Sequence, residues 1–133
     1  MFFGSVLVSW AFKKQHIVSR SSREVEYRAV AHTTVKLQWI QNILMEMGVT
    51  QSCSPVLFCD NVWTIYLIAN PLYHFRTKHL ELDFHFVLEI IANGKLHIQY
   101  VPTELQLVDM FTKSLGITRF TLLRDKLDIG LPC

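Results

Sequence analysis

The chain has 133 residues, half of them hydrophobic and 18% charged, with a formal net charge of +2. This composition is typical of one globular domain and excludes a disordered chain, and so small a charge does not by itself indicate nucleic-acid binding. Three cysteines without a CxxC pair argue against a disulfide framework or a zinc ribbon. With neither a signal-like leader nor a long apolar run, we expect an intracellular protein, cytoplasmic or nuclear, with no membrane partner.

The N-terminal residues predict a strand. Residues 5–12 alternate between two faces, one of which carries Val6, Val8, Trp10 and Phe12. Gly4 precedes this strand as a turn residue, so the chain is expected to begin inside a β-hairpin. Lys13 and Lys14 follow, and they suit either a solvated loop or a contact with phosphate.

A long helix is predicted from Ser21 to about Met47. It opens with an S-x-x-E capping box, Ser21 to Glu24, and Gly48 is expected to stop it. Its expected apolar stripe consists of Val30, Thr33, Leu37, Ile40, Leu44 and Met47. Extended back by one step, the stripe reaches Glu26. A core-facing carboxylate in the first turns gains from the helix dipole but still needs a partner, so Glu26 is a candidate site residue.

A short apolar strand is predicted at residues 55–59, buried on both faces. Asp60 follows it directly. Burying a carboxylate at a strand end is costly without a cation or hydrogen bonds, and ligands of α/β sheets bind at the carboxyl ends of strands. Two interpretations stay open for Asp60: a ligand-binding acid, or the N-cap of the helix that follows.

Two helices and a loop are predicted after Asp60. Residues 62–69 suit a short helix that ends before Pro71. Residues 73–79 interleave basic and aromatic side chains, a mixture that suits phosphate and base-stacking contacts and also occurs in ordinary surface loops. Residues 81–92 suit a second helix, whose inward face is expected to carry Leu82, Phe86 and Ile90.

The C-terminal third predicts a strand and two more helices. The strand is expected at residues 95–101, with Leu96, Ile98 and Tyr100 on one face. Thr103-x-x-Gln106 has the form of a second capping box. The helix that it would open carries Asp109 at the edge of its apolar face, where Lys113 could pair with it. A last amphipathic helix is expected at residues 118–127.

This order of elements is an α/β pattern with three acids at element ends or core edges: Glu26, Asp60 and Asp109. If they converge, each carboxylate raises the pKa of the others unless a cation neutralises them. Hard oxygen ligands suit Mg²⁺ or Mn²⁺, and a carboxylate cluster holding two such ions can hydrolyse phosphodiesters. Acids at helix starts are also common as caps, so spacing alone leaves both readings open.

Several runs in the sequence resemble the Pol polyproteins of copia-type LTR retrotransposons. The N-terminal runs, similar to "SWxSKKQxxVSRSSTEAEYRA", are Val8-Ser9-Trp10, Lys13-Lys14-Gln15 and the residues from Ser19 to Ala29. The central runs, similar to "DN…ANP…RTKHIE…HFV", are Asp60-Asn61, Ala69-Asn70-Pro71, Arg76 to Glu81 and His85-Phe86-Val87. The last run, Val101 to Leu115, is similar to "VPTxxQLADxFTKxL", and the resemblance covers essentially the whole chain in order.

The segment that the chain resembles is the C-terminal ribonuclease H domain, which cleaves the RNA strand of RNA–DNA hybrids with two Mg²⁺ (or Mn²⁺) ions. The resemblance implies an α/β, ribonuclease H-like mixed sheet flanked by helices. It implies that Glu26, Asp60 and Asp109 are catalytic, metal-binding acids. It also implies contacts with a nucleic acid by Lys13, Lys14, Asn61, Arg76, Lys78 and His79.

The family's fourth acid belongs to a first, central strand in a "YSDADWAG"-like motif, which these 133 residues lack. The resemblance therefore implies one incomplete domain over residues 1–133, truncated at its N-terminus, with metal binding weakened or lost and no activity alone. An upstream reverse transcriptase segment or another chain could supply the strand. Lys36, Trp63, Thr64 and Leu88 also depart from the family pattern, and Trp63 could crowd the mouth of the site.

Two other functions stay open. The chain could be a non-enzymatic transposon remnant that at most binds nucleic acid or a protein partner. A metal-binding module of Cys53, Cys59, His79 and His85 is disfavoured because neither cysteine lies in a CxxC pair. Serine-hydrolase and P-loop functions lack their motifs.

Overall fold

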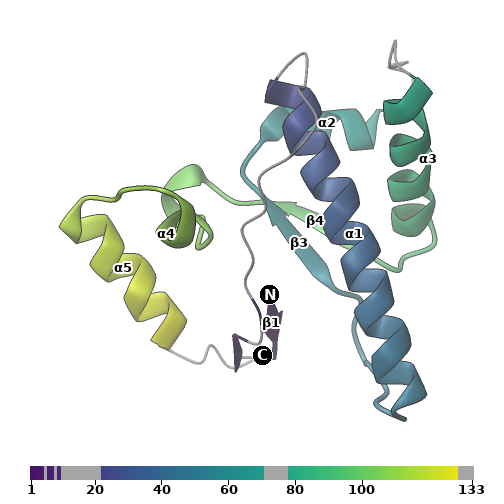
Figure 1. Ribbon diagram of the computed structural model, residues 1–133, viewed down its shortest axis with the longest axis horizontal. Helices are drawn as coiled ribbons and strands as arrows, with labels where there is room; N and C mark the ends of the chain where they lie inside the picture. The colour runs from purple at the N-terminus through teal and green to yellow at the C-terminus, as the bar shows by residue number, and fades with distance from the viewer. Residues whose placement is uncertain (5, 8, 10–21, 71–77, 129–133) are drawn as a thin grey trace. The chain divides into compact units, whose positions relative to one another are not determined.

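The computed structural model describes residues 1–4, 6–7, 9, 22–70 and 78–128, and the chain divides into two compact units (Figure 1). One unit, the central unit, is Ser19–Tyr100. The other, the terminal unit, combines Met1–Val18 with Val101–Cys133. The expectation of a single incomplete domain that lacks its central strand stays a prediction.

The central unit has a mixed α/β architecture, as the sequence predicts. Its elements are α1 (Ser22–Glu46), β3 (Val56–Cys59), α2 (Val62–Ala69), α3 (Lys78–Ala92) and β4 (His97–Tyr100). The two strands are parallel, with Val56 opposite His97 and Cys59 opposite Tyr100. Helices α2 and α3 lie in the connection between the strands, as parallel pairing requires a long crossover.

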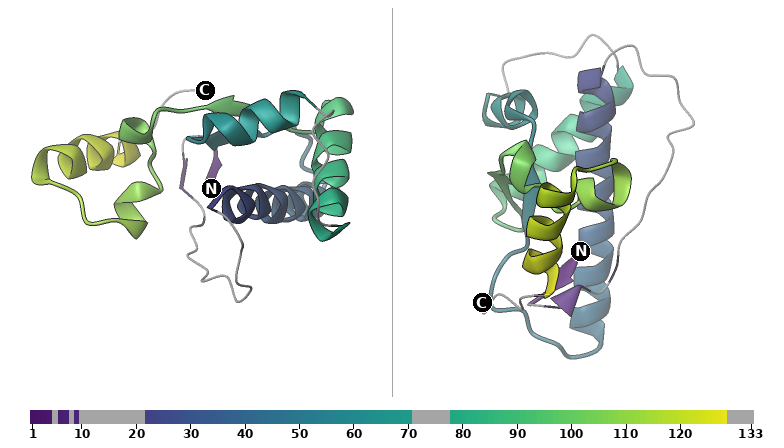
Figure 2. Two further views of the ribbon diagram at one scale, coloured as in Figure 1. Left: turned by 90° about the horizontal axis from the view of Figure 1, so that it is seen from above. Right: turned by 90° about the vertical axis from the view of Figure 1, so that its left-hand side faces the viewer.

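The core of the central unit lies between β3 and the helices α1 and α3. Figure 1 shows α1 and α3 side by side, and the view from above in Figure 2 shows α3 closing the side between α1 and α2. The buried hydrophobic side chains that pack together in this core are Val30, Ala31, Leu57, Cys59, Val87, Ile90 and Leu96. These side chains join one turn of α1 to the inner face of β3, to α3 and to the residue before β4.

Glycines end both long helices, as expected for Gly48. Gly48 has a φ of 75°, and the Val49 N–H donates to the Leu44 carbonyl at 2.8 Å. Gly94 repeats this at the end of α3 with a φ of 67°. Glycine adopts the left-handed backbone conformation at little cost, because it has no Cβ atom. The hydrogen bond that follows it satisfies one of the carbonyls that the helix end leaves free.

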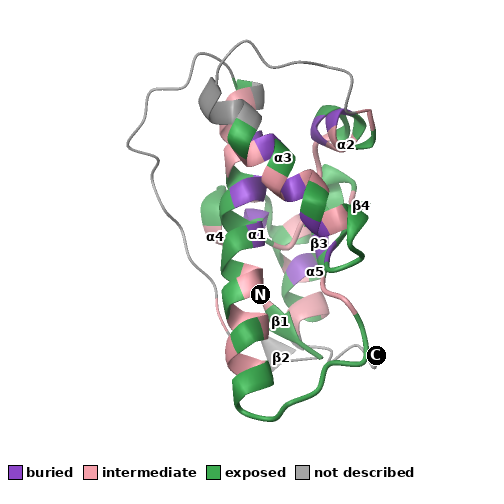
Figure 3. Ribbon diagram, turned by 90° about the vertical axis from the view of Figure 1, so that its right-hand side faces the viewer, coloured by how far each residue is buried: buried purple, intermediate pink, exposed green. Residues whose placement is uncertain are grey.

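The predicted inward faces of both long helices are partly wrong. On α1 the buried residues are Tyr27, Val30, Ala31 and Thr34, whereas Thr33 and Met47 of the predicted stripe are exposed. The early turns of α1 pack on the core, and its later turns are mostly exposed or half-buried (Figure 3). On α3 Leu82 is 70% exposed, and the inward residues are Phe84, Val87 and Ile90. The periodicity of apolar residues predicts the spacing of an apolar face along a helix. It does not predict which of those residues the rest of the chain covers.

The prediction that β3 is buried on both faces is also wrong. Leu57 and Cys59 are buried, but Val56 and Phe58 are exposed, Phe58 by 56%. The helices cover the inner face of β3, so alternate side chains of the apolar run point away from the core.

The terminal unit is built from small elements. Strands β1 (Phe2–Phe3) and β2 (Val6–Leu7) form an antiparallel hairpin, with Gly4 at a φ of 60° in the turn. The remaining positions of the predicted strand 5–12 lie outside the described residues, apart from Ser9. After Val101 come a 3₁₀ turn, η1 (Thr103–Leu105), then α4 (Asp109–Thr112) and α5 (Ile117–Asp128).

The second predicted capping box is wrong. Thr103 lies inside η1, whose N-cap is Pro102, and no side chain of the described residues caps that turn. The predicted helix is therefore split into η1 and the short α4. Within the described ranges, no helix is long and apolar enough to cross a membrane.

Candidate metal site

Asp60 lies immediately after the carboxyl end of β3, and it is not the N-cap of α2. The cap is Asn61, whose Oδ1 accepts a hydrogen bond from the Thr64 N–H at 3.0 Å. The capping interpretation of Asp60 is therefore wrong. Since its neighbour satisfies the helix start, the Asp60 carboxylate is left for another role.

Glu26 faces the same region from α1. Its Oε2 atom is buried and has no hydrogen-bond partner among the described residues. Burial raises the pKa of the Glu26 carboxyl above its ordinary 4.5, and the nearby Asp60 carboxylate raises it further. The structure therefore brings two of the three predicted acids together, one from a strand end and one from a helix.

A small aromatic cluster holds the Glu26 turn of α1 in place. Tyr27, the next residue, is completely buried with Leu67 of α2 and Phe84 of α3. The rings of Tyr27 and Phe84 have centroids 5.7 Å apart. Burial, and then the Asp83 carboxylate, raise the pKa of the Tyr27 phenol. These contacts tie α1 to both other helices, and they fix the backbone that carries Glu26.

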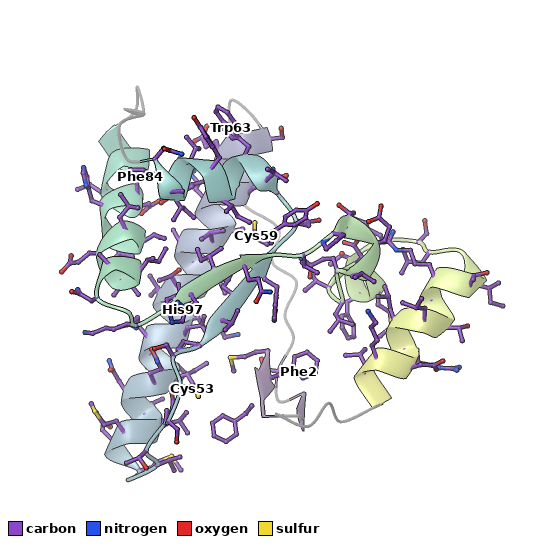
Figure 4. All side chains as sticks on the ribbon, turned by 180° about the vertical axis from the view of Figure 1, so that it is seen from behind. Phe2, Cys53, Cys59, Trp63, Phe84 and His97 are labelled. Carbon is purple, nitrogen blue, oxygen red and sulfur yellow. The ribbon has the colours of Figure 1, made fainter. Side chains whose placement is uncertain are left out.

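Cys59 is a third group that responds to the two acids. It is buried at the α2 end of β3 (Figure 4), and its Sγ lies 3.8 Å from the Asn61 carbonyl oxygen. Burial raises the pKa of its thiol, the hydrogen bond to Asn61 lowers it, and the carboxylates of Asp60 and Glu26 raise it. The sequence places Cys59 beside Asp60, but only the fold places Glu26 near it.

The alternative module of cysteines and histidines gains no support. Cys53 is exposed and Cys59 is buried, and the side chain of His79 lies outside the described part. Among the described residues, no group of three or more His, Cys, Asp or Glu side chains could hold a metal ion.

Asp109 belongs to the terminal unit and has a different environment. It is 4% exposed, and both of its oxygens pair with cations: Oδ1 with Lys113 Nζ at 2.9 Å and Oδ2 with Arg119 Nη2 at 2.7 Å. The expected Lys113 pair is confirmed. No local sequence pattern predicts the contact of Arg119, which reaches Asp109 from α5.

Most predicted nucleic-acid contacts cannot be placed. Lys13, Lys14 and Arg76, and the side chains of Lys78 and His79, lie outside the described residues. Asn61 is half-buried and caps α2. Trp63, a departure from the family pattern, stacks on Tyr66 along α2, with ring centroids 5.6 Å apart. The contacts of the six residues with a nucleic acid stay predictions.

The donor atoms of the Glu26–Asp60 pair fit a hard divalent cation. Both ligands are carboxylates, and the pair carries like charge that a cation would neutralise. Within the described part of the chain, one Glu26 oxygen is buried without a hydrogen bond. Two carboxylates are a partial ligand set, since Mg²⁺ takes six ligands and keeps several waters.

Comparison with known proteins finds similarity to retrovirus-related Pol polyproteins from transposons. The chain is 46% identical to that from transposon RE2 of Arabidopsis thaliana over 120 residues, and 42% identical to that from transposon RE1 over 129 residues. It is 32% identical to that from transposon TNT 1-94 of Nicotiana tabacum over 123 residues. These alignments cover 90%, 97% and 92% of this chain. The chain is homologous to a segment of retrotransposon Pol polyproteins.

That segment is a small part of each relative. The chain spans 8% of the RE2 polyprotein and 9% of the RE1 and TNT 1-94 polyproteins. No protein-family model and no solved structure matches it. The resemblance to Pol polyproteins is confirmed, and its assignment to the C-terminal ribonuclease H domain stays a prediction.

Proposed function

We propose that this Pol-derived chain is a ribonuclease H-like segment, whose family reaction is two-metal hydrolysis of the RNA strand of RNA–DNA hybrids. The observation that carries the proposal is the Glu26 carboxyl near Asp60: one of its oxygens is buried with no hydrogen-bond partner among the described residues, and burial and the Asp60 carboxylate raise its pKa. A protein leaves such a pair uncompensated at functional sites more often than elsewhere.

Glu26 and Asp60 would hold the cation, and Asp109 completes the acids implied by the resemblance. Bound Mg²⁺ supplies an activated water and stabilises the leaving oxygen. The chain's own contribution is to keep the two carboxylates in place: Asn61 caps α2, which frees Asp60, and the Tyr27 cluster fixes the turn that carries Glu26.

The 133 residues alone are expected to bind cations weakly and to leave hybrids uncut. Two carboxylates meet in the central unit, whereas both oxygens of Asp109 are paired with cationic side chains. Removing oxygen ligands from a two-metal site removes the charge that holds the second ion. The fourth acid that the resemblance implies would add to this ligand set.

A non-enzymatic remnant is the second candidate, and the pairing of Asp109 favours it. The charge of a carboxylate that pairs with two cationic side chains is already compensated, so a metal ion would add little stabilisation. Both candidates allow nucleic-acid binding, so cleavage and cation binding have to separate them.

The first test measures the thermal shift of the 133-residue chain with Mg²⁺ or Mn²⁺. We expect either cation to raise the melting temperature of the wild type but not that of Asp60→Asn. Asp125→Asn is the matched control, since this exposed aspartate pairs with Arg124 on α5. Equal shifts in all three chains would sink the proposed cation site.

The second test measures cleavage of an RNA–DNA hybrid with Mn²⁺, by the chain alone and by a longer Pol segment that includes the residues upstream. We expect cleavage by the longer segment, and its loss in Asp60→Asn. A longer segment that binds hybrid without cutting it would favour the remnant.

Hybrid binding tests the predicted basic contacts. Arg76→Ala with Lys78→Ala should weaken binding and reduce the slope of log K against log salt by about 1–2, if each contacts a phosphate. An unchanged slope would remove these two residues from the contact surface.

A further inference from the structure

The ion pairs of Asp109 connect three elements of the terminal unit. Lys113 lies one turn after Asp109, whereas Arg119 comes from α5. The same guanidinium nitrogen, Arg119 Nη2, also donates to the Thr103 carbonyl of η1. Arg119 therefore joins η1, α4 and α5 at a single buried carboxylate.

Arg119 contributes more to this arrangement than Lys113. The Lys113 side chain is 52% exposed, so water screens its ammonium and this contact adds little. The Arg119 side chain is 32% exposed, and its Nε is buried without a hydrogen-bond partner among the described residues. A planar guanidinium with two acceptors is held more firmly than a flexible ammonium.

The two cations matter for any metal at Asp109. A divalent cation would need the oxygens that Lys113 and Arg119 now occupy, and positive charges within a few ångströms repel strongly away from bulk water. The ammonium can swing into solvent at little cost. The guanidinium can leave only by giving up its contacts to α4 and η1.

We propose that Arg119 is a built-in counter-ion of Asp109, so that a divalent cation binds Asp109 only when Arg119 withdraws from it. This inference rests on the proposed function for the identity of the cation. It makes Arg119 a positioning residue whose contact opposes metal binding, and it couples the docking of α5 to the state of Asp109.

The test measures Mn²⁺ affinity and stoichiometry by isothermal titration in the complete 133-residue chain. Arg119→Gln should bind Mn²⁺ about tenfold more tightly, or bind one ion more, because one competing charge is gone. Asp109→Asn added to Arg119→Gln should abolish the gain. Arg124→Gln is the matched control, an arginine of the same helix whose partner is the exposed Asp125.

A purely structural role for Arg119 predicts something else: weaker hydrogen-exchange protection of α5 with Mn²⁺ affinity unchanged. That outcome would overturn the proposal. If Arg119→Gln does not fold, Arg119→Lys carries the test. Its single ammonium cannot hold both acceptors in the same way, and we expect Mn²⁺ binding about two- to threefold tighter than wild type; unchanged affinity would overturn the proposal here too.

Failure of this inference is distinguishable from failure of the proposed function. The proposed cation site is tested by the wild-type response and its loss in Asp60→Asn. The counter-ion is tested by a gain that depends on Asp109. Either result can be positive while the other is negative.

Discussion

Glu26 is half-buried and Asp109 is buried, and the neighbours of the two acids carry opposite charge. Glu26 meets another carboxylate, Asp60, and one of its oxygens has no hydrogen bond among the described residues. Asp109 is more deeply buried, and each of its oxygens meets a cationic side chain. Among the described residues no ion pair reaches Glu26, whereas Asp109 finds both of its cations within the terminal unit.

The difference separates two uses of a buried acid. An ion-paired carboxylate anchors elements, and removing it leaves its partners uncompensated. A pair of carboxylates destabilises the chain slightly, because the two negative charges repel each other. A bound cation would remove this repulsion, so such a pair favours cation binding. Burial alone therefore does not identify a metal ligand, and the charge around the acid is more informative.

The largest expected effect comes from Asp109→Ala. It leaves Arg119 and Lys113 without their carboxylate, which should destabilise the terminal unit by about 3 kcal/mol, the lower end for a broken buried pair because both cations are partly exposed. Hydrogen exchange should show the loss at α5, with α3 of the central unit unaffected.

Asp125→Ala is the control for that variant. Asp125 pairs with Arg124 at 2.9 Å, but both side chains are 53% exposed. Such pairs contribute about 0–1 kcal/mol. A loss at α5 as large as that of Asp109→Ala would contradict the assignment of Asp109 as its anchor.

The sequence predicted much of the order of elements and part of the site. Apolar periods located α1, α3 and β4 to within a few residues, and Gly48 located the end of α1, because helix stops depend on local backbone geometry. The motif around Asp60 singled out this strand end. The sequence left open whether Glu26 and Asp60 converge, because acids at helix starts are also common as caps; the electrostatic effect of Asp60 on the pKa of Glu26 appears only in the fold.

What the sequence missed depends on contacts distant along the chain. The pair between Asp109 and Arg119 joins two helices and has no local pattern. The same holds for the exposed Phe58 and Leu82, whose burial depends on which neighbours cover them. The capping interpretation of Asp60 failed for another reason: Asp and Asn are both good N-caps, and only the backbone geometry shows that Asn61 is the one used.

An intermediate effect is expected for Asn61→Ala. Losing the cap of α2 should cost about 1 kcal/mol, visible as faster hydrogen exchange in the first turn of α2. Asn61→Asp keeps an acceptor and should retain most of the protection. Asp60→Ala should leave the hydrogen-exchange protection of that turn as in the wild type. Faster exchange there would mean that Asp60 also caps α2.

The smallest expected change in stability is that of Glu26→Gln. Its sign tests most directly whether Glu26 and Asp109 have surroundings of opposite charge. Folding raises the pKa of Glu26 above 4.5, so the folded chain favours the protonated acid. Its contribution is therefore fully present below the unfolded pKa and is lost as the pH rises through the folded one. Glu26→Gln should be more stable than the wild type at pH 7 by less than about 1 kcal/mol, since Glu26 is partly exposed and water screens it.

The gain of Glu26→Gln should vanish near about pH 4, where the wild-type acid is protonated. Glu46→Gln, at the exposed end of the same helix, is the matched control for the loss of one carboxylate from α1. Thermal melts with saturating Mg²⁺ at pH 7 should then reverse the order, because the cation stabilises the intact pair and finds one ligand fewer in the variant. A variant less stable than the wild type at pH 7 without cation would mean that Glu26, like Asp109, already has its counter-charge inside the protein.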